Sequence, residues 1–260
     1  MVRPFFFGEA AHRLFGIYHQ PSEHGSGAAR AVVLCPPAPQ EYMTTHWAFR
    51  RLAVLLAKAG THVLRFDYFG TGDSAGATEE GTLEDWQNDV LVAERALRER
   101  SGAERVSLVG YRMGAVLAWR ASQSASPKPR DLVLWDPVVR GAGYLEELRA
   151  SERAFASRLL YFPHFETPPR ELGGYPLPAA LRHATEAIDL TKEALPAATR
   201  VHAYVGRETP DSLALSGRLK QELKRFSYQH VPEEGFKGSG NLLSNRILQV
   251  ISGALSSESV

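Results

Sequence analysis

Short apolar segments alternate with longer amphipathic segments along most of this chain, and this alternation restricts its fold more than any other feature. Runs such as 31–35 and 132–135 have the continuous apolar character of strands that are buried on both faces. Parallel strands need a long crossover between them, so the alternation predicts an α/β fold with a mostly parallel, doubly wound sheet of about eight strands. The expected strands are 5–7, 14–18, 31–35, 62–66, 106–109, 132–135, 200–205 and 226–231, and the expected helices are 47–59, 83–100, 115–124, 212–223 and 241–255.

Residues 141–195 break this alternation. The interrupted region contains two helical stretches, 145–160 and 179–188. An aromatic segment, 161–165, lies between them. We therefore expect 141–195 to be a helical cap inserted into a core that comprises 1–140 and 196–260. Loops at the carboxyl edge of a parallel sheet overhang the crevice where ligands bind, so the aromatic side chains of the cap are expected to face a cavity: Tyr161, Phe162 or Phe165.

The segment Gly110-Tyr111-Arg112-Met113-Gly114 joins an expected apolar strand to an expected helix. It has the frame of a nucleophile elbow, G-x-S-x-G, in which two glycines permit a sharp turn and the central residue projects above the sheet. Arginine occupies the serine's position, and a guanidinium stays protonated and has no nucleophilic lone pair. An ordinary strand-to-helix turn is the other interpretation. The expected strand before this segment and the expected helix after it favour the elbow, although its serine nucleophile is replaced by arginine.

The two residues that would complete a catalytic triad are also missing from their expected places. The acid should follow the penultimate strand, where Thr209 stands with Glu208 and Asp211 as neighbours. The histidine should follow the last strand, where Phe236 stands, whereas His230 falls earlier, inside the expected strand. Loss of one triad member already costs several orders of magnitude in rate, so the sequence predicts no serine-type hydrolysis.

Other residues near the same edge of the sheet are candidates for relocated chemistry. Cys35 ends a strand just before the loop that supplies one oxyanion-hole amide in such folds, and His46 is a conceivable base eleven residues further on. A buried structural cysteine is the alternative. The nine histidines show no paired-ligand spacing, so no metal site is expected. The two glycines at 70 and 72 lack the spacing of a dinucleotide loop, and we expect no cofactor.

Composition narrows the classes of partner. The 260 residues suit one large domain, and the net charge of +1 argues against a nucleic-acid surface. The single cysteine excludes an internal disulfide and fits a reducing compartment. The amino-terminal residues lack the core of a signal peptide, and no run approaches the ~20 apolar residues of a membrane helix. A cytoplasmic protein without a membrane span is expected.

Several motifs together resemble the α/β-hydrolase superfamily in its serine-aminopeptidase-like branch, and more closely the second hydrolase-like proteins associated with exosortase A systems. The resemblance spans about residues 30–190 and rests on five segments: 36–41, 66–76, 110–114, 134–138 and 174–190. Members of that subfamily tend to carry arginine in the elbow. The chain departs from their pattern after Glu41 and at Asp136, where an uncharged polar residue is typical. The resemblance implies the fold but no established reaction, because fold does not fix function.

Two hypotheses from different classes follow. The first is a binding or accessory protein without serine-type hydrolysis. Arg112 opens a helix, where the helix dipole disfavours a cation, so we expect it to pair with Glu41, with Asp136 or with an anionic ligand. The ligand would be a small anionic or acyl-type metabolite, contacted by Arg112, Met113, Glu41, Tyr42 and Tyr68. In the simpler version of this hypothesis, Arg112 forms an internal ion pair that fills a pocket with no remaining function. The sequence indicates no particular protein partner.

The second hypothesis is an enzyme with altered chemistry. A hydrolase, acyltransferase or lyase would act on an ester or acyl-thioester through relocated residues, with Glu41, His46, Asp136 and Cys35 as the catalytic candidates. The polar and partly acidic residues expected around the elbow support it, and the missing serine opposes it.

Overall fold

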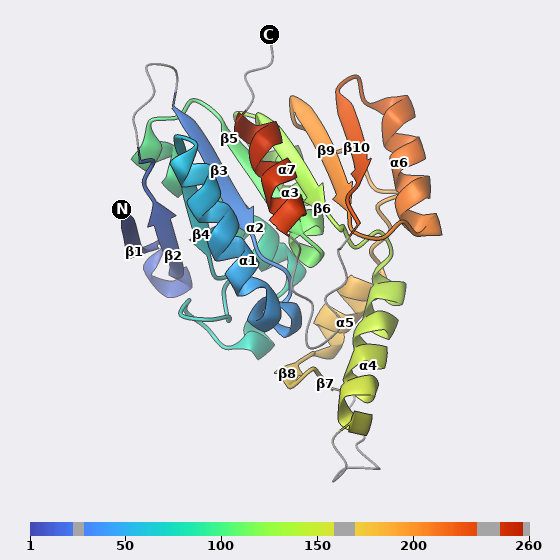
Figure 1. Cartoon of the computed structure of the whole chain (residues 1–260). Helices are drawn as coiled ribbons and strands as arrows, with labels where there is room; N and C mark the ends of the chain where they lie inside the picture. Colours follow the sequence, from blue (N-terminus) through green and yellow to red (C-terminus); the bar gives the residue numbers. More distant parts are fainter. Residues whose placement is uncertain (23–28, 159–169, 233–244, 257–260) are drawn as a thin grey trace.

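The computed structural model describes residues 1–22, 29–158, 170–232 and 245–256. Its main element is an eight-stranded sheet with the strand order β1-β2-β4-β3-β5-β6-β9-β10 (Figure 1). The strands are β1 (Val2–Phe7), β2 (Leu14–His19), β3 (Arg30–Cys35), β4 (Thr61–Phe66), β5 (Val106–Tyr111), β6 (Asp131–Trp135), β9 (Arg200–Val205) and β10 (Phe226–His230). The strand β2 runs antiparallel to β1 and β4, and all the other pairings in this sheet are parallel. The expected mostly parallel α/β sheet is therefore confirmed.

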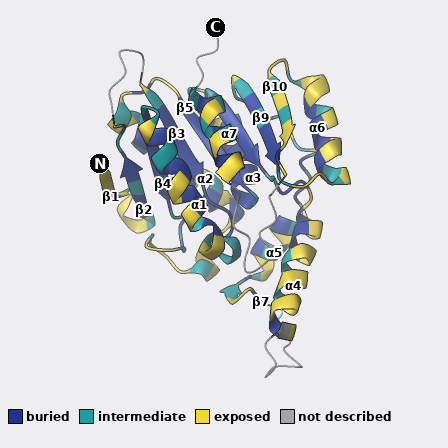
Figure 2. Cartoon of the chain, in the orientation of Figure 1, coloured by how far each residue is buried: buried dark blue, intermediate teal, exposed yellow. Residues whose placement is uncertain are grey.

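Helices cover both faces of the sheet. The large helices of the core are α1 (Pro39–Lys58), α2 (Leu83–Ser101), α3 (Met113–Ser124), α6 (Pro210–Glu222) and α7 (Asn245–Ser256), and two short 3-10 helices span Ala10–His12 and Thr78–Glu80. Side chains of α1 and α7 pack in one apolar cluster with one face of the sheet, and those of α2, α3 and α6 pack in a second cluster with the other face. Figure 2 shows the resulting buried sheet between helices whose outer faces are exposed. Among the described helices, none is both long and apolar enough to cross a membrane.

The helix α1 starts at Pro39, eight residues before the expected start at Trp47. Proline suits the first turn of a helix, because its fixed φ is already helical and its missing N–H would have no partner there. Glu41, Tyr42 and His46 therefore lie on helix α1, whereas the sequence-based interpretation placed Glu41 and Tyr42 in a loop. The helix α2 begins as expected, with Thr82 and Asp85 forming a reciprocal cap.

Between β6 and β9 the chain forms α4 (Gly141–Arg158), the two-residue strands β7 (Glu171–Leu172) and β8 (Tyr175–Pro176), and α5 (Ala179–Glu186). The two ends of this excursion meet, since Arg140 and Asp189 form an antiparallel bridge and the Leu190 amide donates to the Val139 carbonyl at 2.9 Å. Adjacent ends are what an inserted unit requires. The division into a core and a cap at 141–195 remains our proposal, and Tyr161, Phe162 and Phe165 lie outside the described residues.

Candidate functional site

The turn between β5 and α3 has the geometry of an elbow. Arg112 adopts φ 53° and ψ −117°, a backbone conformation that side-chain-bearing residues rarely adopt. The two flanking glycines are required by close packing: a Cβ atom on Gly110 would collide with the backbone of Gly114, and one on Gly114 with the carbonyl oxygen of Cys35. The sharp turn expected from the glycine spacing is therefore present, with Arg112 at its apex.

The Arg112 side chain is held by two carboxylates from two different helices. Its Nε donates to Glu41 Oε1 on α1 at 2.9 Å, and its Nη2 donates to Glu147 Oε2 on α4 at 2.6 Å. The Tyr144 hydroxyl donates to the other oxygen of Glu41 at 2.6 Å, and the guanidinium carbon lies 5.1 Å from the centroid of the Tyr144 ring. These four side chains form what we call the elbow network: Glu41, Arg112, Tyr144 and Glu147.

The elbow network is largely shielded from solvent. The side chains of Arg112 and Glu41 are 17% and 15% exposed, whereas that of Glu147 is 52% exposed. Burial raises the pKa of the Glu41 carboxyl, and the positive charge of Arg112 opposes this. Burial acts to lower the pKa of Arg112, but the charges of Glu41 and Glu147 outweigh it and raise that pKa. Glu41 is thus the inner partner of the guanidinium and Glu147 the outer one.

The expected ion pair of Arg112 with Glu41 is confirmed, although through Nε rather than through the terminal nitrogens. The alternative partner, Asp136, has a structural role: with φ 41°, it accepts a hydrogen bond from the Gly206 amide at 2.7 Å and so links the ends of β6 and β9. The sequence reasoning missed Tyr144 and Glu147. Their spacing of three residues near the start of a predicted helix was the available signal, since it places both on one helical face.

The loop between β3 and α1 is poorly equipped to stabilise an oxyanion. In hydrolases of this fold one stabilising amide follows the nucleophile and the other comes from this loop. Residues 36–39 read Pro-Pro-Ala-Pro, and proline has no N–H group. Only Ala38 can offer an amide from these four positions, a limitation that the sequence reasoning overlooked.

The residues at the other triad positions have structural partners. Thr209 caps helix α6 by accepting from the Ser212 amide, Glu208 accepts from the Tyr228 hydroxyl, and Asp211 pairs with Arg140 at 2.9 Å. His230 is the last residue of β10, in agreement with its expected place inside a strand. Its Nε2 lies 3.2 Å from the Gly206 carbonyl oxygen. Phe236 lies outside the described residues.

The Cys35 and His46 pair lacks the features of a nucleophile and its base. Cys35 is fully buried, and burial raises the pKa of its thiol, which keeps it neutral near pH 7. His46 lies on the second turn of α1 and its Nδ1 is 2.9 Å from the Met43 carbonyl oxygen. Within the described ranges, no hydrogen bond joins the two side chains, and no group of three metal-binding side chains occurs. The geometry therefore opposes a thiolate mechanism at Cys35.

Two cavities lined by described residues lie near the carboxyl edge of the sheet, and three of the five expected ligand-binding residues line them. The smaller, about 20 Å³, lies under the cap beside Met113 and Tyr144 and has room for little more than a water molecule. The larger, about 470 Å³, lies beside β4 and is lined by Tyr42, His46 and Tyr68. Arg112 lines neither of these two cavities. A pocket that contains Arg112 together with these residues therefore remains a prediction.

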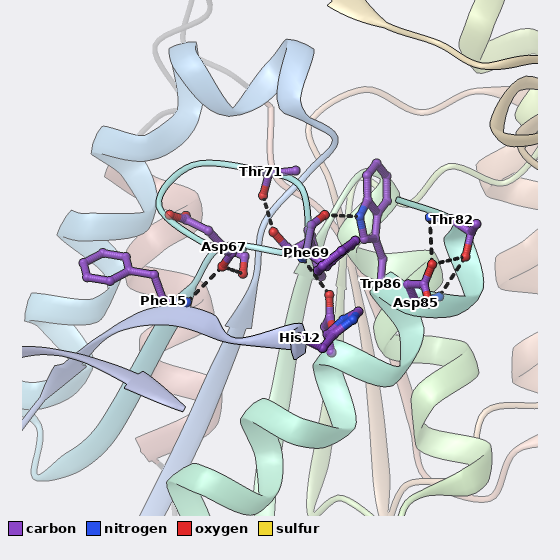
Figure 3. Close-up of polar contacts among 11 residues, drawn as sticks. His12, Phe15, Asp67, Phe69, Thr71, Thr82, Asp85 and Trp86 are labelled. Carbon is purple, nitrogen blue, oxygen red and sulfur yellow. Dashed lines mark hydrogen bonds and ion pairs between the residues drawn. The ribbon is translucent and has the colours of Figure 1, made fainter. Parts of the chain in front are cut away.

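The loop after β4 forms one wall of the larger cavity and is fixed by polar contacts (Figure 3). Asp89, fully buried on α2, accepts from the Phe69 amide at 2.8 Å and lies 2.8 Å from His12 Nε2. The indole of Trp86 donates to the Phe69 carbonyl at 3.0 Å, and Ser74 Oγ donates to the Asp67 carbonyl at 2.6 Å. These contacts hold the wall in place without a ligand, so the cavity is preformed.

Arg65 and His19 lie side by side on β4 and β2 at the larger cavity, where Arg65 forms part of the lining. Arg65 Nε donates to His19 Nε2 at 3.2 Å, so the imidazole is an acceptor and neutral. Burial, and to a smaller extent the charge of Arg65, lower the pKa of His19 to about 4.

The stability of the protein is expected to decrease as the pH falls from about 6.5 to about 4 because of His19. In that window the unfolded chain binds a proton at this imidazole and the folded chain does not, which lowers the free energy of unfolding by on the order of 3 kcal/mol. Urea unfolding at several pH values measures this. His19→Gln should flatten the pH dependence, and His183→Gln, at an exposed position on α5, should leave it unchanged. An equal slope in His19→Gln would contradict the assignment.

The strand order and the elbow at the end of β5 define the α/β-hydrolase fold. Residues 30–200 match the family model described as serine aminopeptidase, S33, and the chain belongs to this family. Solved structures share the fold at low identity. Est1E from Butyrivibrio proteoclasticus, solved with ferulic acid bound, has a TM-score of 0.68 at 15% identity, covering 97% of this chain and 96% of that one.

Two further structures share this fold. A putative hydrolase from Agrobacterium vitis S4 has a TM-score of 0.65 at 20% identity, covering 98% of this chain and 97% of that one. The Pyrococcus furiosus esterase PF2001 has a TM-score of 0.65 at 16% identity, covering 98% of this chain and 87% of that one. No curated protein sequence matches the chain significantly. At these identities the likeness concerns the fold alone.

Proposed function

We propose that this chain is a binding or accessory protein on a hydrolase scaffold, without serine-type hydrolysis, and that it binds a small anionic or acyl-type metabolite near the elbow. The observation that carries the proposal is Arg112 at the apex of the turn, neutralised by Glu41 and Glu147. Where a serine enzyme presents a hydroxyl to its substrate, this chain presents a closed ion-pair network. The resemblance noted above supports an accessory role beside an exosortase A system.

Glu147 is the part of the elbow network that a ligand can replace. Its side chain is 52% exposed, and exposed ion pairs contribute little to stability, typically about 0–1 kcal/mol. A ligand carboxylate that takes its place on Arg112 Nη2 would leave the inner pair of Arg112 and Glu41 intact. Met113 and Tyr144, which line the small cavity below, would then contact the ligand's first apolar atoms.

The alternative is an enzyme with relocated residues, and one contact favours it. The Tyr144 hydroxyl and the Glu41 carboxylate are 2.6 Å apart and largely buried, as a proton-transfer pair would be. A hydrolase, acyltransferase or lyase acting on an ester or acyl-thioester would use Glu41 in this way. His46, Asp136 and Cys35, the other candidates, are less suited, because each is engaged or buried as described above.

Turnover and ligand-binding measurements separate these functions, whereas a serine-directed probe does not. A fluorophosphonate probe should not label the protein under either function, since both lack a serine nucleophile at the elbow. Turnover of p-nitrophenyl butyrate or of an acyl-thioester by the unmodified protein would favour the enzyme and contradict the binding protein. No turnover above the buffer rate, together with saturable binding of a carboxylate, is the outcome we expect.

The Arg112→Ser variant is expected to show no appreciable esterase activity. Serine needs a general base within hydrogen-bond reach, and Phe236 stands in the sequence position of that base. The hydrolysis of p-nitrophenyl butyrate by this variant should equal that of Arg112→Ala, the matched control without a hydroxyl. Faster turnover by the serine variant would show that a histidine reaches the elbow, with His230 and His46 as the first to test.

A further inference from the structure

The larger cavity is a built space that the elbow network does not use. Its volume of about 470 Å³ falls in the range of small-molecule sites. Much of its lining is apolar or aromatic, including Phe15, Ile17, Pro36, Tyr68 and Tyr175. The Tyr68 hydroxyl donates to the Pro36 carbonyl at 3.1 Å, so this ring is fixed against the loop before α1.

A buried cation lines this cavity. Arg65 is only 9% exposed, and within the described parts of the chain no carboxylate oxygen lies within 4.0 Å of its nitrogen atoms. Its hydrogen-bond partners there are uncharged: His19, the acceptor described above, and the Tyr42 hydroxyl, to which the guanidinium also donates. Five N–H groups with two such acceptors leave donors available for a further acceptor.

A buried guanidinium without a contacting carboxylate is costly: desolvation lowers the pKa of Arg65, and the more distant charge of Asp67 only partly opposes this. Other buried ion pairs of this chain show the usual solution: Arg200 bonds Asp131 through two nitrogen atoms. We propose that the larger cavity binds the carboxylate of a small acid with an apolar body, and that Arg65 is its counterion. The inference rests on the proposed binding function and moves the ligand's anionic group from Arg112 to Arg65.

The charges in the cavity restrict the anion to a single negative charge. Asp67, two residues after Arg65, and the exposed Asp73 also line the cavity and would repel a dianion such as a phosphate monoester. Asp67 accepts from the Asp73 amide at 3.1 Å, which holds its carboxylate in the loop. A monocarboxylate would place its head at Arg65 and Tyr42 and its apolar chain against Phe15 and Tyr68.

The probe for this site is octanoate, with octanamide as the uncharged analogue of the same length. Isothermal titration should show octanoate binding that is at least about tenfold weaker in Arg65→Met, as expected for loss of one charge-assisted contact. The matched control is Arg51→Met, which removes an exposed arginine from helix α1 and should leave the affinity unchanged. Octanamide should bind the unmodified protein more weakly than octanoate does.

The stability of the same variant gives a second readout. Without ligand, Arg65→Met should melt at or above the temperature of the unmodified protein, because a buried charge that contacts no carboxylate is replaced by an apolar chain of similar length. A large drop in melting temperature, or failure to fold, would show that Arg65 has an internal structural role and would overturn the proposal.

The titration also separates this inference from the proposed function. If octanoate binding is lost in Arg112→Met and kept in Arg65→Met, the ligand binds at the elbow, and only the assignment to Arg65 is wrong. If the unmodified protein binds neither probe, the carboxylate site is wrong. Turnover of an ester or thioester by the unmodified protein would contradict the proposed non-hydrolytic function. The proposal for Arg65 would still stand or fall on the octanoate affinity of Arg65→Met relative to the unmodified protein.

Discussion

Glu41→Gln is expected to lower the free energy of unfolding by about 3 kcal/mol, because it removes the inner negative charge from a largely buried ion pair. Arg112 would keep Glu147, which is too exposed to compensate the loss. Tyr144 would keep a hydrogen-bond acceptor, so the effect would report mainly on charge. Urea unfolding at pH 7 measures the difference.

Glu147→Gln is the matched control for this prediction, since the same substitution removes the other carboxylate from the same guanidinium. Its expected cost is at most about 1 kcal/mol, because 52% of that side chain is exposed. Equal losses in the two variants, or a larger loss at Glu147, would show that the outer pair holds the network. The proposed displacement of Glu147 by a ligand would then be wrong.

Gly114→Ala is expected to destabilise the fold by about 3 kcal/mol or more. The added methyl group would overlap the carbonyl oxygens of Cys35 and Pro36, and backbone atoms at the end of a central strand cannot move aside as a flexible side chain can. Thermal or urea unfolding of the purified variant measures the loss.

The control for this prediction is Gly217→Ala on helix α6. A Cβ atom there meets nothing within 4 Å, so alanine should stabilise the helix by up to about 1 kcal/mol. A Gly114→Ala variant as stable as the unmodified protein would mean that the turn can relax away from β3. The close packing described for the elbow would then be incorrect.

The sheet could be predicted from the sequence because its strands are buried on both faces, and such strands show as uninterrupted apolar runs. The strand β9 lies where it was expected, and the other strands of the main sheet differ by a few residues at their ends. The start of α1 was missed because its first turns carry polar and β-branched residues around Thr44 and Thr45, which conceal the helical periodicity that Pro39 begins.

The candidate site was predictable where the backbone dictates it, and less so where two distant segments meet. The elbow and the pair of Arg112 with Glu41 follow from local motifs and from the position of a cation at a helix start. The contact with Glu147 depends on where α4 lies relative to the turn before α3, which no local pattern reports. The same applies to the placement of Tyr42 and Tyr68 in one cavity and of Met113 in another, since side-chain packing decides which residues line a common space.

The prolines at 36, 37 and 39 also bear on how readily this scaffold could be engineered toward serine-type hydrolysis. Such chemistry at this elbow would need a serine at the apex, a histidine after the last strand and a new amide donor in the loop before α1. The first of these changes would also remove the ion pair of Arg112 with Glu41. An engineered serine is therefore expected to cost stability at the turn before the other two changes can make use of it.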